Sequence, residues 1–222
     1  MHKPFWGLQG IWTEGCQGNE QTGQHAAMGI SGIIAGLGNP GPGYARTRHN
    51  AGFMVIDRLI ASQEKIPGDQ VRLKSESRDV IVWEWTSSSF SGTWLLLKPL
   101  TFMNRSGTAV SRIYSRTMLE IDRLLIVHDE VDLPLGSLRF KQGGGLAGHN
   151  GLRSIASHLG TRDFARLRFG VGRPEDGADL ADYVLSKFSP AELELKDSTV
   201  EKAVHGLRIF CSHGLEKAGT SL

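Results

Sequence analysis

The chain has 222 residues, of which 40% are hydrophobic, and its formal net charge at pH 7 is +2. This length suits one globular domain with a single core, and no apolar run is long enough to span a membrane. Bulk charge does not indicate a nucleic-acid binder, so any such surface must come from local clustering. Cys16 and Cys211 lie far apart, without metal-ligand spacing, which favours a reducing cytoplasm over a disulfide framework or a zinc site.

Residues 1–28 differ in composition from the rest of the chain. They are rich in Gly, Gln and Trp and lack the basic-then-apolar pattern of a signal peptide. Met28 stands directly before the first expected strand. We therefore expect residues 1–28 to be a disordered or non-native extension, and residues 29–222 to form the folded domain.

Beyond that extension, hydrophobic periodicity predicts strands that alternate with helices. Strands are expected near 30–36, 71–74, 79–86, 93–98, 123–128, 137–141 and 164–171. Helices are expected near 50–63, 104–117, 149–159, 178–186 and 190–213. Residues 86–92 are typical of a hairpin turn, and Ser189, Pro190 and Glu192 fit a capping box that starts the last helix. Continuous apolar strands such as Leu124–Val127 predict a single α/β domain with a mixed sheet buried on both faces.

The glycine-rich stretch after the first strand, Gly36–Gly41, matches the dinucleotide-binding fingerprint literally. In that fold the helix opens inside the glycine motif, and an acidic residue ends the next strand. Here Pro40 and Pro42 hold the backbone in a turn. Asp57, at about the right distance, falls in the middle of a helix. A dinucleotide-dependent oxidoreductase is therefore the weaker interpretation.

A histidine and a carboxylate are predicted to meet at one edge of the sheet. His49 lies where a helix begins, and strand 123–128 leads into Asp129. The carboxyl ends of central strands form the usual ligand crevice of α/β sheets. The helix dipole disfavours protonated His49, whereas a carboxylate fixes the histidine tautomer and stabilises the imidazolium. Such a pair suits a general base, worth roughly 10²–10⁴ in rate. Asp129 is preferred over Glu130 and Asp132 because it follows the buried run directly, and a helix-capping histidine that never meets the carboxylate is the alternative.

No protein nucleophile stands out in the sequence. There is no G-x-S-x-G elbow, and neither cysteine lies in a motif. Activated water is therefore the simplest nucleophile for a histidine base. A metal site formed by His49, His128, Asp129 and His149 is an alternative. In metal-dependent phosphohydrolases, however, the His-Asp pair lies in an all-helical setting, whereas here it ends an apolar strand, so we predict no metal.

Three asparagines, Asn39, Asn104 and Asn150, fall at expected junctions between loops and regular elements. An amide offers donors and an acceptor without charge. Three such groups suit recognition of a peptide backbone or orientation of a water molecule. N-capping explains Asn104 or Asn150 singly, but explains all three less well.

Basic residues are paired on two expected strands. Arg139 and Lys141 are two apart, so their side chains point the same way, as do those of Arg166 and Arg168. Between the pairs runs Gly143–Gly145, which leads into a helix whose free N–H groups favour an anion. The combination predicts a phosphate-binding site.

Taken together, the motifs resemble those of bacterial peptidyl-tRNA hydrolases from about Ile33 to the last helix. The resemblance rests on residues 36–41, Tyr44 with 47–50, 98–99 with 101–104, 128–130 with 132–134, 143–145 with 148–151, and 166–168, in that order. It implies a twisted mixed β-sheet flanked by helices in three αβα layers, in a monomeric, cytoplasmic enzyme. The implied reaction is hydrolysis of the ester that joins a peptide to the terminal ribose of tRNA, without metal or organic cofactor, and the implied partner is peptidyl-tRNA.

The resemblance also implies roles for individual residues. His49 would be the base, Asp129 would orient it, and Asn39 would lie beside the reacting centre. The residues implied to contact the substrate are Tyr44, Phe102, Asn104, His149 and Asn150, and those implied to bind tRNA phosphate are Lys141, Arg168 and Arg139. The chain departs from the pattern at Ala147, where the family often has glycine, and in its long N-terminal extension. A catalytically silent RNA-binding relative is the alternative, which would keep the basic face but need not keep the Asn39–His49–Asp129 set.

Overall fold

The computed structural model describes residues 29–62, 65–174 and 178–222, so the expectation for residues 1–28 lies outside the described part of the chain. Within that part, one seven-stranded sheet has the order β2-β3-β4-β1-β5-β7-β6. Its strands are β1 (Ile30–Gly36), β2 (Gln70–Glu76), β3 (Val80–Ser87), β4 (Phe90–Pro99), β5 (Leu124–Glu130), β6 (Leu138–Gln142) and β7 (Ala165–Gly170). The helices are α1 (Ala51–Ser62), α2 (Ser106–Tyr114), α3 (Asn150–Leu159), α4 (Leu180–Leu185) and α5 (Leu193–Thr220).

The sheet is mixed, which confirms the predicted fold class. Strand β1 pairs in parallel with β4 and β5, and β5 pairs in parallel with β7. The outer strands β2, β3 and β6 run antiparallel to their neighbours. The carboxyl ends of four strands therefore meet at one edge of the sheet, where α/β proteins bind their ligands.

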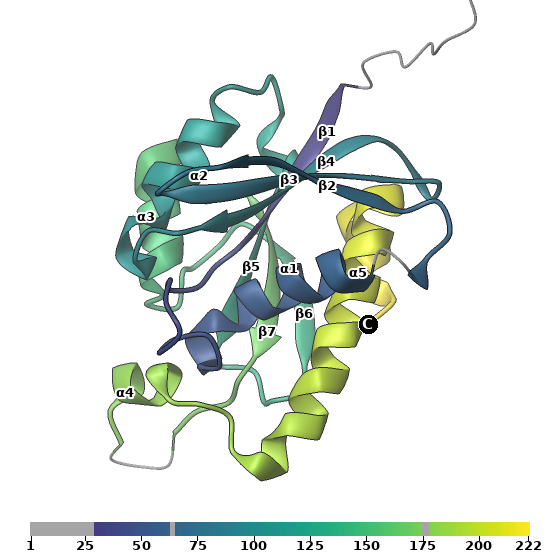
Figure 1. The fold of residues 1–222 in the computed structure, drawn as a ribbon. Helices are drawn as coiled ribbons and strands as arrows, with labels where there is room; N and C mark the ends of the chain where they lie inside the picture. Colours follow the sequence, from purple (N-terminus) through teal and green to yellow (C-terminus); the bar gives the residue numbers. More distant parts are fainter. Residues whose placement is uncertain (1–28, 63–64, 175–177) are drawn as a thin grey trace, which may run out of the picture.

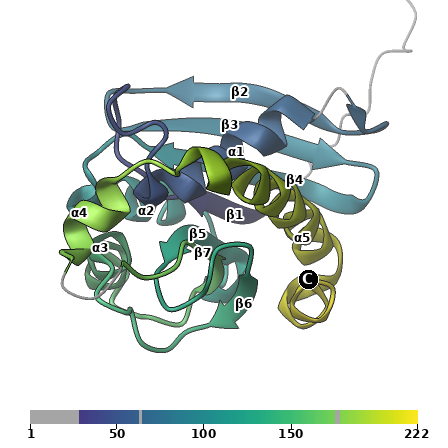
Figure 2. The same cartoon turned by 90° about the horizontal axis from the view of Figure 1, so that it is seen from below.

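Two apolar cores cover the two faces of the sheet and make three layers (Figures 1 and 2). Successive residues of β1 point to opposite faces. Ile34 belongs to the core under α1 and α5, whereas Ile33 belongs to the core under α2 and α3. Among the described helices, none has the length and apolarity to cross a membrane.

Helix α1 lies directly against the backbone at the carboxyl ends of β1 and β5. A Cβ atom on Gly52 would lie 2.3 Å from the Leu37 nitrogen and 2.4 Å from the Val127 carbonyl oxygen, so a side chain does not fit there. The Leu37 N–H donates to that same Val127 oxygen at 2.9 Å, and the Phe53 N–H donates to the Leu37 oxygen at 3.2 Å. These contacts fix the start of α1 beside the end of β5.

Several element boundaries differ from the sequence-based expectation. The hairpin turn expected over 86–92 is tighter, because Phe90 is buried edge-on against Trp85 and already belongs to β4. The helix expected over 104–117 is shorter: residues Met103–Arg105 form a 3₁₀ turn, and α2 ends at Tyr114.

The capping box before the last helix is present. Glu192 accepts a hydrogen bond from the Ser189 N–H at 2.6 Å. The capping box starts a 3₁₀ turn, Pro190–Glu192, which leads into α5. Helix α5 also runs past the expected end at residue 213. Gly214, with φ 81° and ψ −176°, interrupts it with a kink where periodicity was expected to stop.

Candidate active site

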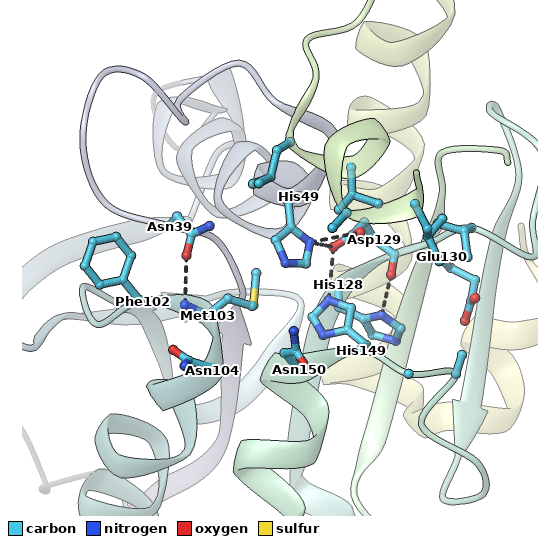
Figure 3. Close-up of a pocket in the computed structure, with 17 residues that line it drawn as sticks. Asn39, His49, Phe102, Met103, Asn104, His128, Asp129, Glu130, His149 and Asn150 are labelled. Carbon is cyan, nitrogen blue, oxygen red and sulfur yellow. Dashed lines mark hydrogen bonds and ion pairs between the residues drawn. The ribbon is translucent and has the colours of Figure 1, made fainter. Parts of the chain in front are cut away.

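A cavity of about 580 Å³ opens at the carboxyl edge of the parallel strands (Figure 3). It is lined by Asn39, His49, Phe102, Met103, Asn104, His128, Asp129, Glu130, Val131, Ala147, Gly148, His149, Asn150, Leu180, Ala181, Val184 and Leu185. Seven of the eight residues expected to act in catalysis or to contact substrate line this cavity, and Tyr44 is the exception. The cavity thus gathers groups from the ends of β1, β4 and β5 and from the start of α3.

His49 and Asp129 meet in this cavity. His49 lies in the 3₁₀ turn Arg48–Asn50 directly before α1, and its Nδ1 lies 2.9 and 3.1 Å from the two carboxylate oxygens of Asp129. Because Asp129 accepts, Nδ1 carries the proton and Nε2 keeps a free lone pair. The sequence predicts that the strand ends before Asp129. In the structure β5 extends to Glu130, so Asp129 lies inside the strand. The pair has the geometry of a general base held by a carboxylate.

Asp129 is buried, and its carboxylate is stabilised by two histidines. Burial alone would raise the pKa of this carboxyl group, but interactions with His149 and then His49 outweigh burial, and the pKa lies well below its ordinary value. The group therefore stays ionised in the folded protein at neutral pH. An ionised carboxylate can stabilise a positive charge that develops on His49.

His149, which was expected to contact substrate, contacts Asp129 instead of merely facing the cavity. Its Nε2 lies 3.0 Å from Asp129 Oδ1. Its Nδ1 accepts hydrogen bonds from the N–H groups of Gly151 and Leu152, at 3.1 and 3.3 Å, so His149 is the N-cap of α3. Neither Asn104 nor Asn150 caps a helix: Asn104 lies in a 3₁₀ turn, and Asn150 is the first residue of α3.

His128 is the third histidine beside Asp129, and its ring packs against that of His149. It is fully buried, and its Nδ1 donates to the Asp129 carbonyl oxygen at 2.7 Å. Burial, with His149 nearby, lowers the pKa of His128 to about 3, so this ring is neutral. The candidate ligand atoms of His49, Asp129 and His149 lie within 4.8 Å of one another, a spacing that also suits a metal ion. His49 and His149 each form a hydrogen bond with Asp129, and their two rings lie 5.0 Å apart between centroids.

Asn39 is held by Met103 and Asn50, neither of which the sequence analysis identifies as a site residue. Its Oδ1 accepts from the Met103 N–H at 2.8 Å, which turns the amide NH₂ group away from Met103. Asn50 holds the backbone of Asn39 from both sides: its Oδ1 accepts from the Asn39 N–H and its Nδ2 donates to the Asn39 carbonyl, each at 2.9 Å. Asn104 and Asn150 also line the cavity, and both are exposed. The cavity therefore carries three amides in addition to His49.

Of the residues expected in catalysis or substrate contact, Tyr44 is the one that does not line the cavity. Its ring packs edge-on against Phe102, with 6.4 Å between centroids, and Phe102 does line the cavity. The opposite wall is apolar and comes from α4, through Leu180, Val184 and Leu185. Periodicity predicted that helix, but nothing in the sequence indicated where it would pack.

The expected phosphate-binding residues lie on β6 and β7, outside the cavity lining. Arg139 pairs with Arg168 across the two strands and Lys141 pairs with Arg166, so all four side chains share one face. Arg139 and Lys141 are exposed.

The two arginines of β7 already have partners. The Nε of Arg168 donates to Glu130 at 2.8 Å. Arg166 is buried, and its Nη1 donates to the Gly145 carbonyl oxygen at 2.7 Å. The glycine-rich loop is thereby attached to this face. Within the described residues, Ala147 of that loop is the one non-glycine residue with positive φ, at 47°.

The comparisons with known proteins agree with this geometry. The family profile described as peptidyl-tRNA hydrolase matches residues 33–222. The peptidyl-tRNA hydrolase of Nitratidesulfovibrio vulgaris strain DP4 is 46% identical over 188 residues, which cover 84% of this chain and 94% of that protein. The peptidyl-tRNA hydrolase of Frankia alni is 48% identical over 187 residues, covering 83% of this chain and 89% of that protein.

Solved structures give the same result. The crystal structure of peptidyl-tRNA hydrolase from Acinetobacter baumannii superimposes with a TM-score of 0.74 at 34% identity, over 86% of this chain and 95% of that chain. The profile match and the curated relatives both span most of the chain. The chain therefore belongs to the peptidyl-tRNA hydrolase family.

Proposed function

We propose that this protein hydrolyses the ester between the peptide and the 3′-terminal ribose of peptidyl-tRNA, and so recycles tRNA from abortive translation. The observation that carries the proposal is the His49–Asp129 pair, in which Nδ1 is engaged and Nε2 is free, inside a cavity of about 580 Å³. Membership of the peptidyl-tRNA hydrolase family supports the same reaction.

In the proposed mechanism, His49 Nε2 removes a proton from a water molecule as the water oxygen attacks the ester carbonyl carbon. Asp129 stabilises the imidazolium that forms. The tetrahedral intermediate then collapses, the C–O bond to the ribose breaks, and the imidazolium returns its proton to the leaving ribose oxygen. The products are a free peptide carboxyl and a free tRNA hydroxyl, and His49 ends in its starting state.

The amides are assigned to the peptidyl part of the substrate. The NH₂ group of Asn39 would donate to the oxyanion, since the Asn39 carbonyl oxygen already accepts a hydrogen bond from the Met103 N–H. Asn104 and Asn150 would hold the peptide backbone, and Phe102, with Tyr44 behind it, would contact a side chain. Binding of a peptide bond in this way would favour a blocked over a free aminoacyl group.

The tRNA part would lie along the exposed basic face of β6 and β7. Lys141 and Arg139 are free to contact phosphate, and Arg168 reaches the same face while it is paired with Glu130. We further propose that the enzyme needs no metal or organic cofactor, acts as a monomer and works in the cytoplasm.

The test is release of free tRNA from N-acetyl-aminoacyl-tRNA by the wild type and by His49→Ala, with EDTA present. Unblocked aminoacyl-tRNA is the control substrate. Fast cleavage of the blocked substrate alone, lost in the variant, supports a metal-free hydrolase with His49 as base. Retained tRNA binding without cleavage by the wild type would make the protein a silent RNA-binding relative. Inhibition by the chelator would instead support the metal site.

A further inference from the structure

We propose that His149 is a positioning residue that holds the Asp129 carboxylate for His49. The opposite side of the same ring caps helix α3, and the neutral Nε2–H tautomer makes both contacts at once. The expected effect of His149 on the reaction rate rests on the proposed function. The contacts of His149 with Asp129 and with the start of α3 concern the free protein and are tested separately.

The two ring nitrogens of His149 have different partners that fix the position of the proton. The Gly151 and Leu152 N–H groups both point at Nδ1, at 3.1 and 3.3 Å. A nitrogen that accepts N–H groups cannot itself carry a proton. The proton therefore lies on Nε2, which is 3.0 Å from Asp129 Oδ1 and donates to it.

A doubly protonated His149 would lose the cap. An Nδ1–H would face two backbone N–H groups at the start of α3, where the helix dipole also opposes positive charge. The charged and titratable groups that face the ring are Asp129 at 3.0 Å, the His49 ring at 5.0 Å between centroids and the His128 ring at 5.1 Å. His128 is buried and neutral, so among the residues that the structure describes Asp129 is the one full charge in contact with His149.

The arrangement makes Asp129 Oδ1 a shared acceptor. It receives hydrogen bonds from His49 at 2.9 Å and from His149 at 3.0 Å. The bond from His149 keeps the carboxylate from turning and disperses part of its negative charge. Without it, the carboxylate interacts more strongly with protonated His49, and the base is lost to protonation at a higher pH.

Two substitutions separate the two contacts of His149. In His149→Asn the amide oxygen takes the place of Nδ1, where asparagine is a preferred N-cap, but the side chain no longer reaches Asp129. In His149→Gln the NH₂ group reaches the place of Nε2 and can donate to Asp129, whereas glutamine lacks the short side chain of a helix cap. Each variant is the control for the other.

For His149→Asn we expect a melting temperature close to that of the wild type and a kcat lowered roughly tenfold to a hundredfold. The acidic limb of its kcat/KM profile should move to higher pH by about 0.5–1 unit. For His149→Gln we expect the wild-type pH profile and a lower melting temperature. A purely structural His149 would give pH profiles identical to that of the wild type in both variants. That result, or an unshifted profile for His149→Asn alone, overturns the proposal.

A second measurement does not depend on activity. In ¹⁵N NMR spectra of the full chain, His149 should show a protonated Nε2 and an unprotonated Nδ1 at neutral pH. The opposite tautomer, or an imidazolium at that pH, overturns the inference even if the enzyme is active. If the expected tautomer is found but the wild type does not cleave N-acetyl-aminoacyl-tRNA, the proposed function fails while the assignment of the His149 contacts stands.

Discussion

Arg48 and Glu192 lie 144 residues apart in the sequence and form an ion pair beside the cavity, with the Arg48 Nη2 at 2.7 and 2.8 Å from the two carboxylate oxygens. The Nη1 of Arg48 donates to the Lys187 carbonyl at 2.5 Å, and the guanidinium carbon lies 4.5 Å from the centre of the Tyr183 ring. Arg48 directly precedes His49. One buried side chain thus connects the turn that carries His49 with the segment that joins α4 to α5.

Replacing Arg48 by methionine should lower the free energy of unfolding by about 2–4 kcal/mol, because Glu192 and the Lys187 carbonyl lose a buried partner. Urea unfolding measures this loss. Lys74→Met is the matched control, since Lys74 pairs with Glu84 on the surface, with exposed fractions of 43% and 40%, and should change stability by less than about 1 kcal/mol. Equal losses in the two variants would show that the Arg48 contacts have no special weight.

Stability should depend on the charge of Asp129 in acid. Its pKa is lower in the folded than in the unfolded chain because His149 and His49 outweigh burial. A group of this kind stabilises the fold above its unfolded pKa of about 3.9, and the contribution is lost as the pH falls below that value. Asp129→Asn should therefore be less stable than the wild type at pH 7, and the difference should shrink between about pH 5 and pH 3. Urea unfolding at a series of pH values measures it; a difference that stays constant with pH would contradict this origin.

Asn39→Asp should lower kcat for N-acetyl-aminoacyl-tRNA by at least roughly 10²–10³, because it removes one oxyanion donor and leaves a negatively charged oxygen in its place. The substitution keeps the oxygen that accepts from the Met103 N–H at 2.8 Å and replaces only the NH₂ group. KM should change little, since the loss falls on the transition state. Asn104→Asp, at an exposed amide of the same cavity, is the comparison and should raise KM more than it lowers kcat. The reverse pattern would exchange the assigned roles.

Lys141→Ala should weaken tRNA binding and reduce the slope of log K against log salt concentration by about 0.7–0.9, the loss of one phosphate contact. The single-turnover rate at saturating enzyme should remain near the wild-type value. Lys74→Ala is the control at the opposite edge of the sheet, on β2, and should leave the slope unchanged. A large loss of single-turnover rate in Lys141→Ala would contradict a role in binding alone.

Arg168 requires a different design, because it is paired. Arg168→Ala leaves the buried Glu130 without its cation, so a loss of tRNA binding would be mixed with a loss of stability. The comparison should therefore use Glu130→Gln with and without Arg168→Ala.

Ala147→Gly should leave stability unchanged or raise it by up to about 1 kcal/mol. The left-handed conformation at φ 47° is strained for alanine and free for glycine, although glycine also gains freedom in the unfolded chain. Ala156→Gly, inside α3, is the control and should cost about 1 kcal/mol. Thermal unfolding compares the two variants, and equal losses would show that the glycine loop carries no strain at Ala147.

The sequence predicted the alternation of strands and helices, because the buried strands are continuous apolar runs such as Leu124–Val127. It also predicted that His49 and Asp129 would meet, because both stand at the carboxyl edge of parallel strands. It did not predict that α4 forms the apolar wall of the cavity. The position of a short helix depends on long-range contacts, here those of Arg48 with Lys187 and Glu192, and periodicity carries no information about them.

The sequence did not predict the contact between His149 and Asp129, for a related reason. Whether a histidine before a helix faces substrate, caps the helix or supports a carboxylate depends on where the ring lies relative to Asp129, twenty residues away. The sequence does not indicate the contacts of Asn50, because its partner is the backbone of Asn39 and a sequence motif does not show backbone partners.

The long-range pairing of Arg48 with Glu192 bears on the synthesis of the protein itself. The turn with His49 is translated early, but Glu192, the ionic partner of Arg48, follows 144 residues later. The contacts of Arg48 beside His49 are therefore complete only after Lys187 and Glu192 have been added to the chain.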